Sequence, residues 1–148
     1  PLLTKIPRLL GTDGRKMSKS YNNHIELFCG EEDLKKRVMS IVTDSATPDE
    51  KKNPDTNNIY NIHKLFLSGD ENNMLRSKFE NGGYGYKDAK EDLLTTIMKW
   101  REGKKEVYDD LLSHPEKITE ILSVGGKFAQ ERASKTMEQV RKQVGLIL

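Results

Sequence analysis

The sequence has little cysteine and little histidine, which excludes some common ways of stabilising or activating a small protein. Cys29 is the single cysteine among 148 residues, so no disulfide can form within the chain and no cysteine cluster can hold a metal. The three histidines, His24, His63 and His114, share no spacing typical of metal ligands. We therefore expect no metal site built from the protein's own side chains.

Long apolar runs and a strong net charge are also missing. No apolar stretch approaches the roughly 20 residues that a membrane-spanning helix needs, and no signal-peptide pattern is present, so the cytoplasm is the expected location. Lysine and arginine number 25 against 23 acidic residues, a formal net charge of +2. This balance argues against a strongly basic nucleic-acid-binding protein but leaves room for a local basic face. The length suffices for one domain with a core.

One short stretch, residues 11–20, is far denser in functional groups than the rest of the chain. It reads Gly-Thr-Asp-Gly-Arg-Lys-Met-Ser-Lys-Ser, and its two glycines allow a tight turn and a close approach of backbone to ligand. Lys16 and Lys19 can place two positive charges on one polyphosphate, while Ser18, Ser20 and backbone N–H groups add neutral donors. The stretch predicts a loop that binds an anion such as a nucleoside triphosphate.

Two other interpretations of residues 11–20 need weighing. A Walker A loop has four residues between its glycines and ends in Gly-Lys followed by Ser or Thr. Here two residues separate Gly11 from Gly14, and Arg15 precedes Lys16, so this alternative is excluded. The other alternative is a basic turn that only faces water, which is the usual outcome for a run of charge. Only the rest of the chain can decide against it.

The segments on either side of the loop differ in character. Residues 2–10 are mostly apolar and predict the tail of a strand or a covered loop. Leu34, Val38, Ile41 and Val42 recur at helical spacing behind an acidic first turn and predict a helix over roughly 31–42. The polar segment 43–58 contains two prolines and no apolar periodicity, which predicts a connector, either a simple linker or a loop that touches a partner.

Further helices are predicted along the middle of the chain. One begins at residue 57 or 58 and stops at Gly69, and Asp70 is expected to cap the next, which runs through Phe79. Three glycines within residues 82–85 then interrupt the periodicity. The longest periodic segment, residues 89–112, predicts a helix that is weakened at Gly103.

The end of the chain predicts two more helices. Pro115 is expected to begin a short helix that Gly125 and Gly126 end, and a last helix is expected to stop at Gly145. No β-hairpin or βαβ pattern follows residue 30. The fold class predicted from the pattern is therefore mainly α, with a helical bundle as the body.

The lysine loop resembles a signature of a known enzyme family. Lys16-Met-Ser-Lys-Ser20 is similar, at every position, to the second signature of the class I aminoacyl-tRNA synthetases. In that family the loop is mobile and closes on ATP, and its lysines steady the pyrophosphate while the amino acid is activated. The resemblance favours ATP binding over a turn that only faces water.

Later segments resemble the bacterial tryptophanyl-tRNA synthetases, in the same order along the chain. They are Ile41–Ser45, Asn57–Ile62, Gly83–Gly85 with the long helix after it, and an ending that runs from Ile121 to Leu146. Tyrosyl-tRNA synthetases share the lysine loop, but the patterns at 43–45 and 83–85 favour tryptophan.

The resemblance implies a division of the chain and a set of ligands. Residues 1–30 would be the end of a Rossmann-like catalytic domain that carries the loop, and residues 31–148 an α-helical C-terminal domain of the anticodon-binding type. The implied cofactors are ATP and Mg²⁺, the latter bound largely through the ATP phosphates. The implied partners are tryptophan and tRNA, and the family works as a cytoplasmic homodimer.

The sequence departs from this family in one large respect. The first class I signature, a stretch like His-Ile-Gly-His, is absent, and His24-Ile-Glu is not one. The tryptophan pocket would also lie upstream of Pro1. We therefore expect the chain to be the C-terminal piece of a longer enzyme and to be inactive alone. A helical RNA-binding or interaction module that merely carries the loop, and an unrelated phosphate-binding protein, remain as alternatives.

The resemblance implies roles for particular residues. Lys16 and Lys19 are the catalytic candidates, because charge builds on the leaving pyrophosphate, and the nucleotide-binding segment is Lys16, Met17, Ser18, Lys19 and Ser20. Met17 is expected to anchor the loop against apolar neighbours.

Two further side chains and one helix face have structural interpretations as well as functional ones. Asp13 is expected to cap the turn, with direct magnesium binding as the weaker alternative. Trp100 occupies an apolar helix position and is expected to pack rather than to stack on a base. The basic face of the last helix is suited to contacts with tRNA phosphates, but an ordinary solvated helix face would show the same pattern, so no residue is assigned to reading the anticodon.

Overall fold

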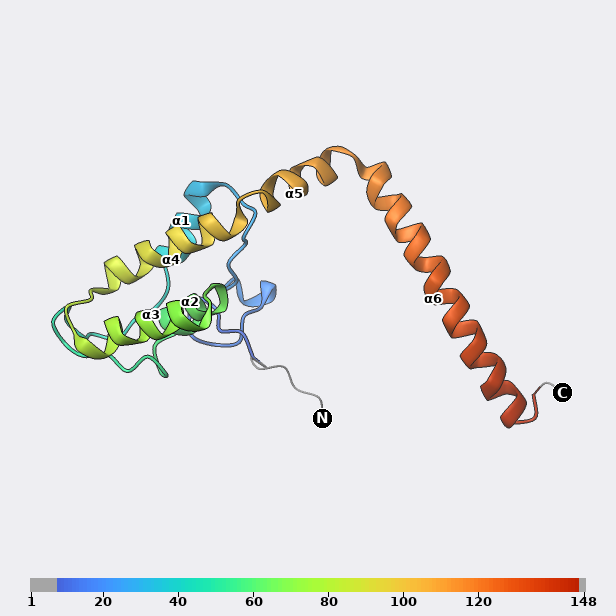
Figure 1. The fold of residues 1–148 in the computed structure, drawn as a ribbon, viewed down its shortest axis with the longest axis horizontal. Helices are drawn as coiled ribbons and strands as arrows, with labels where there is room; N and C mark the ends of the chain where they lie inside the picture. The colour runs from blue at the N-terminus through green and yellow to red at the C-terminus, as the bar shows by residue number, and fades with distance from the viewer. Residues whose placement is uncertain (1–7, 147–148) are drawn as a thin grey trace. The chain divides into compact units, whose positions relative to one another are not determined.

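The structure, a computed structural model, describes residues 8–146, and its regular secondary structure is almost entirely helical (Figure 1). The α-helices are α1 (Glu31–Met39), α2 (Asn58–His63), α3 (Gly69–Asn81), α4 (Tyr86–Arg101), α5 (Lys104–Ser113) and α6 (Pro115–Gln143), and the 3-10 helices are η1 (Lys19–Tyr21) and η2 (Lys64–Phe66). Within residues 8–146 the only β-type pairing is an isolated antiparallel bridge between Leu10 and Lys16. The mainly helical fold class is confirmed, while the expectation for residues 2–7 lies outside the described residues.

The chain divides into two compact units. The first ends at Glu102 and the second begins at Gly103, where a φ of +69° interrupts the helical backbone between α4 and α5. The sequence pattern predicted one helix over residues 89–112 that is weakened at Gly103, and the break falls at this glycine. The predicted domain boundary at residue 30 stays a prediction, because compactness within this chain does not test where a domain of a longer protein would end. No helix within residues 8–146 is long and apolar enough to cross a membrane.

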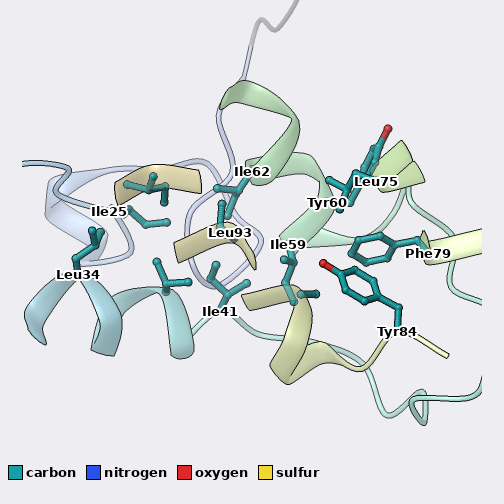
Figure 2. Packing of buried hydrophobic residues seen from close by; sticks show 13 residues of the cluster. Ile25, Leu34, Ile41, Ile59, Tyr60, Ile62, Leu75, Phe79, Tyr84 and Leu93 are labelled. Carbon is teal, nitrogen blue, oxygen red and sulfur yellow. The ribbon is translucent and has the colours of Figure 1, made fainter. Parts of the chain in front are cut away.

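The core of the first unit is one cluster of thirteen buried hydrophobic side chains (Figure 2). Helices α1 and α2 both pack against α4, whose Leu93 and Ile97 lie four residues apart on one face and are fully buried. At one end of the cluster, the Phe79 ring meets Tyr60 and Tyr84 edge-on, with ring centroids 5.7 and 5.2 Å apart. Such edge-to-face contacts stabilise aromatic pairs beyond the area that they bury.

Helix α1 ends three residues earlier than the apolar pattern predicted. It stops at Met39, whose carbonyl accepts a hydrogen bond from Lys90 Nζ (2.9 Å). Val42 lies beyond the helix, and its backbone N–H donates to the carbonyl of Thr12 (2.8 Å). The prediction of a helix to residue 42 was wrong at this end, because pairing with the loop replaces the last helical hydrogen bonds.

The start of α3 also differs from the prediction. Gly69 does not stop a helix and Asp70 is not the cap, since Gly69 is the first residue of α3 and Ser68 precedes it as the N-cap. The carboxylate of Glu71 accepts hydrogen bonds from the Ser68 backbone N–H (2.8 Å) and from its Oγ (2.7 Å). This reciprocal capping box stabilises the helix start, and the same two donors lower the pKa of Glu71.

The predicted break at Gly125 and Gly126 was wrong. Helix α6 runs without interruption from Pro115 to Gln143, and neither glycine has a positive φ. A glycine inside a helix costs only about 1 kcal/mol relative to alanine, so it ends a helix only where the backbone turns away. Gly145, with a φ of +74°, does follow the helix end as predicted.

The polar connector between α1 and α2 is held in place rather than loose. Lys52 is buried, and its Nζ donates to the carbonyls of Thr47 (2.9 Å), Glu50 (2.9 Å) and Pro48 (3.2 Å). Its charge also lies over the ring of Tyr86, at 5.3 Å from the ring centre. The backbone N–H of Lys52 also donates to the Phe79 carbonyl (2.8 Å), so the connector packs against the body of the first unit at Lys52.

Trp100 packs as the sequence pattern predicted. Its ring meets Phe66 edge-on at a centroid distance of 5.7 Å and lies 6.5 Å from Phe28. Beside it, the buried guanidinium of Arg101 donates to the carbonyls of Leu27 and Cys29. These contacts fix the segment that follows the lysine loop to the end of α4.

Candidate functional site

The lysine loop is closed by a tight turn over residues 9–17. Met17 N–H donates to the Leu9 carbonyl (2.9 Å), Gly11 N–H to the Arg15 carbonyl (2.7 Å), and Gly14 N–H to the Gly11 carbonyl (3.0 Å). Gly14 has a φ of +76°, a conformation that glycine adopts without steric cost. The turn predicted from the glycines is confirmed.

One buried amide side chain lies inside this turn. Asn23 is 2% exposed, and a Cβ atom at Gly11 would collide with its side chain. Its Nδ2 donates to Asp13 Oδ1 (2.7 Å) and to the Lys16 carbonyl (3.1 Å), while its Oδ1 accepts from the Ser18 N–H (2.8 Å). Gly11 is therefore required for the close approach of Asn23 rather than for a positive φ.

Asp13 caps the turn, as predicted. Its Oδ1 accepts from the Arg15 N–H (3.0 Å), and its Oδ2 accepts from the Arg15 guanidinium (2.7 Å). The hydrogen bond from the Asn23 side chain is the largest cause of a low Asp13 pKa, and together with the bonds and charge of Arg15 it outweighs desolvation and lowers this pKa to about 2. The Arg15 guanidinium also lies over the Tyr21 ring, 5.2 Å from its centre. Both carboxylate oxygens are thus engaged inside the loop.

The two candidate lysines are presented to solvent. Lys16 and Lys19 are exposed, and the ion pair within the loop joins Arg15 to Asp13 (2.7 Å) and involves neither of them. No other ion pair within residues 8–146 uses either ammonium group. Two charges on a short loop that are not neutralised by carboxylates can attract a polyanion.

The other residues of the segment have different surroundings. Ser18 and Ser20 share a hydrogen bond between their hydroxyl oxygens (2.8 Å), and Ser18 leads into η1 with an extended backbone. Met17 is partly buried and packs against the hydrophobic core, which confirms its predicted anchoring role. The five predicted residues therefore form one continuous segment, with the methionine turned inward and both lysines outward.

Contacts from the helical body hold the base of the loop. On α2, Asn58 Nδ2 donates to the carbonyls of Gly11 (3.0 Å) and Thr12 (3.4 Å). On α1, Arg37 donates two bonds of 2.9 Å to Asn22. Sequence reasoning missed Asn23, Asn58 and Arg37, because their partners lie between 5 and 47 residues away and no periodicity reports such pairs. The one available signal is the Asn-Asn pair at residues 22 and 23, directly behind the loop.

The histidine and cysteine side chains do not form a second site. His63 is buried, its Nε2 lies 2.9 Å from Thr96 Oγ1, and burial lowers its pKa to about 4. Cys29 Sγ donates to the Glu26 carbonyl (2.9 Å), and burial raises the pKa of its thiol. No group of three or more His, Cys, Asp or Glu side chains in the described part of the chain could hold a metal ion. The expectation that the protein builds no metal site remains a prediction.

Comparison with known proteins identifies the class. Residues 1–100 match the family described as tRNA synthetases class I (W and Y), and the chain belongs to this family. The first class I signature is missing from the sequence, and the second is the loop described above.

Within this class, the individual relatives that match the chain are tryptophan–tRNA ligases. A tryptophan–tRNA ligase of Fusobacterium nucleatum subsp. nucleatum is 42% identical over 137 residues, which is 93% of this chain and 42% of that protein. A tryptophan–tRNA ligase of Campylobacter jejuni is 38% identical over 142 residues, 96% of this chain and 44% of that protein. The predicted resemblance to bacterial tryptophanyl-tRNA synthetases is confirmed.

A solved structure agrees with these relatives. The tryptophanyl-tRNA synthetase from Campylobacter jejuni, in complex with ADP and tryptophan, superposes with a TM-score of 0.77 at 37% identity, covering 95% of this chain and 44% of that one. The chain thus spans less than half the length of the relatives that it matches.

Proposed function

We propose that the chain is the C-terminal part of a tryptophan–tRNA ligase and supplies its ATP-phosphate-binding loop and helical tRNA-binding region. The observation that carries the proposal is the segment Lys16–Ser20, in which two exposed lysines follow a turn closed by Gly11 and Gly14 and form no ion pair with any residue of the described range 8–146. The names of the relatives support tryptophan over tyrosine as the amino acid.

The proposed chemistry is the activation of tryptophan by ATP. The tryptophan carboxylate attacks the α-phosphorus in line, and negative charge builds on the departing pyrophosphate. Lys16 and Lys19 would stabilise that charge, and Ser18, Ser20 and loop N–H groups would hold the phosphate oxygens. Mg²⁺ would be bound through the phosphates, because both oxygens of the nearby Asp13 carboxylate already accept bonds from Arg15 and Asn23. The aminoacyl group then passes to tRNA.

The finer description of the fold belongs to the same proposal. Residues 1–30 would end a Rossmann-like catalytic domain, and residues 31–148 would form the C-terminal helical domain that helps to bind the anticodon region. Exposed basic residues of α6 such as Lys127, Lys135 and Arg141 are suited to phosphate contacts, which give affinity without sequence information. The whole enzyme would be a cytoplasmic homodimer.

Tryptophan-dependent ATP–pyrophosphate exchange tests the proposal. It should be measured on this chain and on a version extended upstream to the length of the relatives. We expect exchange only in the extended protein, and a fall in kcat of about 100-fold for Lys16→Ala and for Lys19→Ala, as when one preorganised donor is removed. Lys51→Ala, which removes an exposed lysine of the connector, serves as the matched control and should leave the rate unchanged.

Other outcomes of the same assay would favour the alternatives. Exchange with tyrosine instead of tryptophan would keep the class and overturn the amino-acid assignment. Retention of tRNA binding without any ATP-dependent exchange in the extended protein would favour a helical RNA-binding module. Full exchange by the 148 residues alone would mean that the active site lies elsewhere than proposed.

A further inference from the structure

The side chain of Asn23 forms hydrogen bonds with three different residues of the lysine loop. Its two Nδ2 hydrogens go to the Asp13 carboxylate and to the Lys16 carbonyl, and its Oδ1 receives the Ser18 N–H. Its own backbone carbonyl accepts from the Thr12 N–H (2.8 Å). Both Nδ2 hydrogens and the Oδ1 oxygen of the amide are therefore engaged by the loop, in a position that is 2% exposed.

Only an amide of this size satisfies all three partners. The Lys16 carbonyl and the Asp13 carboxylate both need a donor, whereas the Ser18 N–H needs an acceptor. Aspartate would supply the acceptor but no donor, and it would bring a second carboxylate against Asp13. Alanine would leave the three partners without their bonds in a partly buried place, where lost hydrogen bonds are costly.

The two backbone contacts of Asn23 lie on either side of Met17. The Lys16 carbonyl is held on one side and the Ser18 N–H on the other, while the Met17 side chain packs against the core. The peptide units 16–17 and 17–18, which lie between Lys16 and Lys19, are thus held from inside the turn, although both ammonium groups remain in solvent. A rigid backbone under mobile side chains limits the positions that the two charges can occupy.

We infer that Asn23 is a positioning residue, which holds residues 16–18 so that Lys16 and Lys19 reach the same polyphosphate. The inference rests on the proposed function for the role of the lysines, but the contacts that carry it belong to Asn23 alone. Asn23 acts through the loop and needs no contact with the nucleotide itself.

Amide hydrogen exchange at Ser18, measured by NMR on the 148-residue chain, tests the holding directly. Asn23→Ala should raise the Ser18 exchange rate about tenfold, the effect of losing one hydrogen bond of average strength, while the Leu93 amide in the core stays unchanged. Asn61→Ala is the matched control, because Asn61 also donates two bonds to carbonyls, those of Asp55 (3.0 Å) and Asn57 (2.9 Å), neither of which belongs to the loop. An unchanged Ser18 rate in Asn23→Ala would overturn the inference.

Binding of inorganic pyrophosphate to the same proteins, measured by calorimetry, tests the consequence. Asn23→Ala should weaken binding about tenfold without lowering the melting temperature more than Asn61→Ala does, and Asn23→Asp should weaken it more because of charge repulsion with Asp13. Adding Asp13→Asn to Asn23→Asp restores one carboxylate–amide pair with the roles exchanged, so it should recover part of the loss. A role in global stability alone would instead lower the melting temperature and leave pyrophosphate binding by the folded protein unchanged.

The two readouts separate the inference from the proposed function. Pyrophosphate binding by the wild-type protein that does not depend on Lys16 and Lys19 would overturn the proposed function, and with it the expected effect of Asn23 on that binding. The Ser18 exchange rate would still decide whether Asn23 holds the loop. Lysine-dependent binding that Asn23→Ala leaves unchanged would overturn the positioning role alone.

Discussion

The two compact units carry similar apolar patterns but bury them very differently. Residues up to Glu102 share a cluster of thirteen buried hydrophobic side chains. From Gly103 onward, α5 and α6 contain no buried residue, and Phe128, Leu122 and Val124 are each more than 60% exposed. The 3.6-residue period predicts a helix in both units, yet only in the first does the described chain contain what covers the apolar face.

This difference has a consequence for stability. Helices gain most of their stability in proteins from packing an amphipathic face rather than from intrinsic propensity. The first unit has such packing through α1, α2 and α4. Helix α6 is instead stabilised by its length, by the hydrogen bonds between its own turns and by local ion pairs such as Lys142 with Glu138 (2.9 Å). Substitutions of the same kind should therefore have unequal effects in the two units.

Matched phenylalanine substitutions should give the largest contrast. Phe79→Ala removes a fully buried ring that contacts Tyr60 and Tyr84 and should lower the free energy of unfolding by about 3–5 kcal/mol. Phe128→Ala removes an exposed ring of α6 and should change it by less than about 0.5 kcal/mol. Urea unfolding followed by circular dichroism measures both. Equal losses would mean that the α6 face is covered in solution.

The histidines should give the next largest contrast through pH. Burial lowers the pKa of His63 from 6.5 to about 4, with Asp92 acting weakly in the opposite direction, so the unfolded chain takes up this proton first as pH falls. The contribution of neutral His63 to the free energy of unfolding is therefore fully present above pH 6.5. As the pH falls from 6.5 to 4, this free energy should decrease by about 3 kcal/mol.

A variant of each histidine isolates this effect. His63→Gln should flatten the pH dependence of the free energy of unfolding in that window, whatever its effect on stability at neutral pH. His114→Gln, at the exposed junction between α5 and α6, is the comparison variant and should change the slope less, because its ring is exposed where that of His63 is buried. A steep slope that survives His63→Gln would assign the dependence to other groups.

Glycine substitutions should give the smallest effects, with opposite signs in the two units. Gly82 has a φ of +81°, and an added Cβ would meet the Asp49 carbonyl oxygen of the connector, so Gly82→Ala should destabilise the first unit by more than about 1 kcal/mol. Gly125→Ala and Gly126→Ala meet no atom within 4 Å and should each favour the helical state of α6 by about 1 kcal/mol. Thermal unfolding and helical ellipticity measure the two effects. A loss of helicity in the α6 variants would contradict the assignment of a continuous, uncovered helix.

Local patterns predicted the helices well and their ends poorly. The apolar spacing behind α1, α2, α3 and α4 is visible in the sequence because it depends on neighbours three and four residues away. The early end of α1 depends on a bond between Val42 and Thr12, thirty residues earlier, and could not be foreseen. The start of α3 does have a local signal, because Ser68 is followed three residues later by Glu71, whereas the pattern at Gly69 and Asp70 predicted a stop and a cap one residue or two too late.

The features of the lysine loop also fall into those that the local sequence predicts and those that depend on tertiary contacts. Its residue types and their order determined that the chain resembles class I synthetases and that Lys16 and Lys19 are the candidate charges, because a five-residue signature needs no tertiary information. The amide that shapes the loop from inside, the Asn58 contact that ties it to α2, and the burial that lowers the His63 pKa were decided only by the tertiary structure. Each depends on atoms that folding brings together from distant parts of the chain, and no local spacing encodes such a meeting.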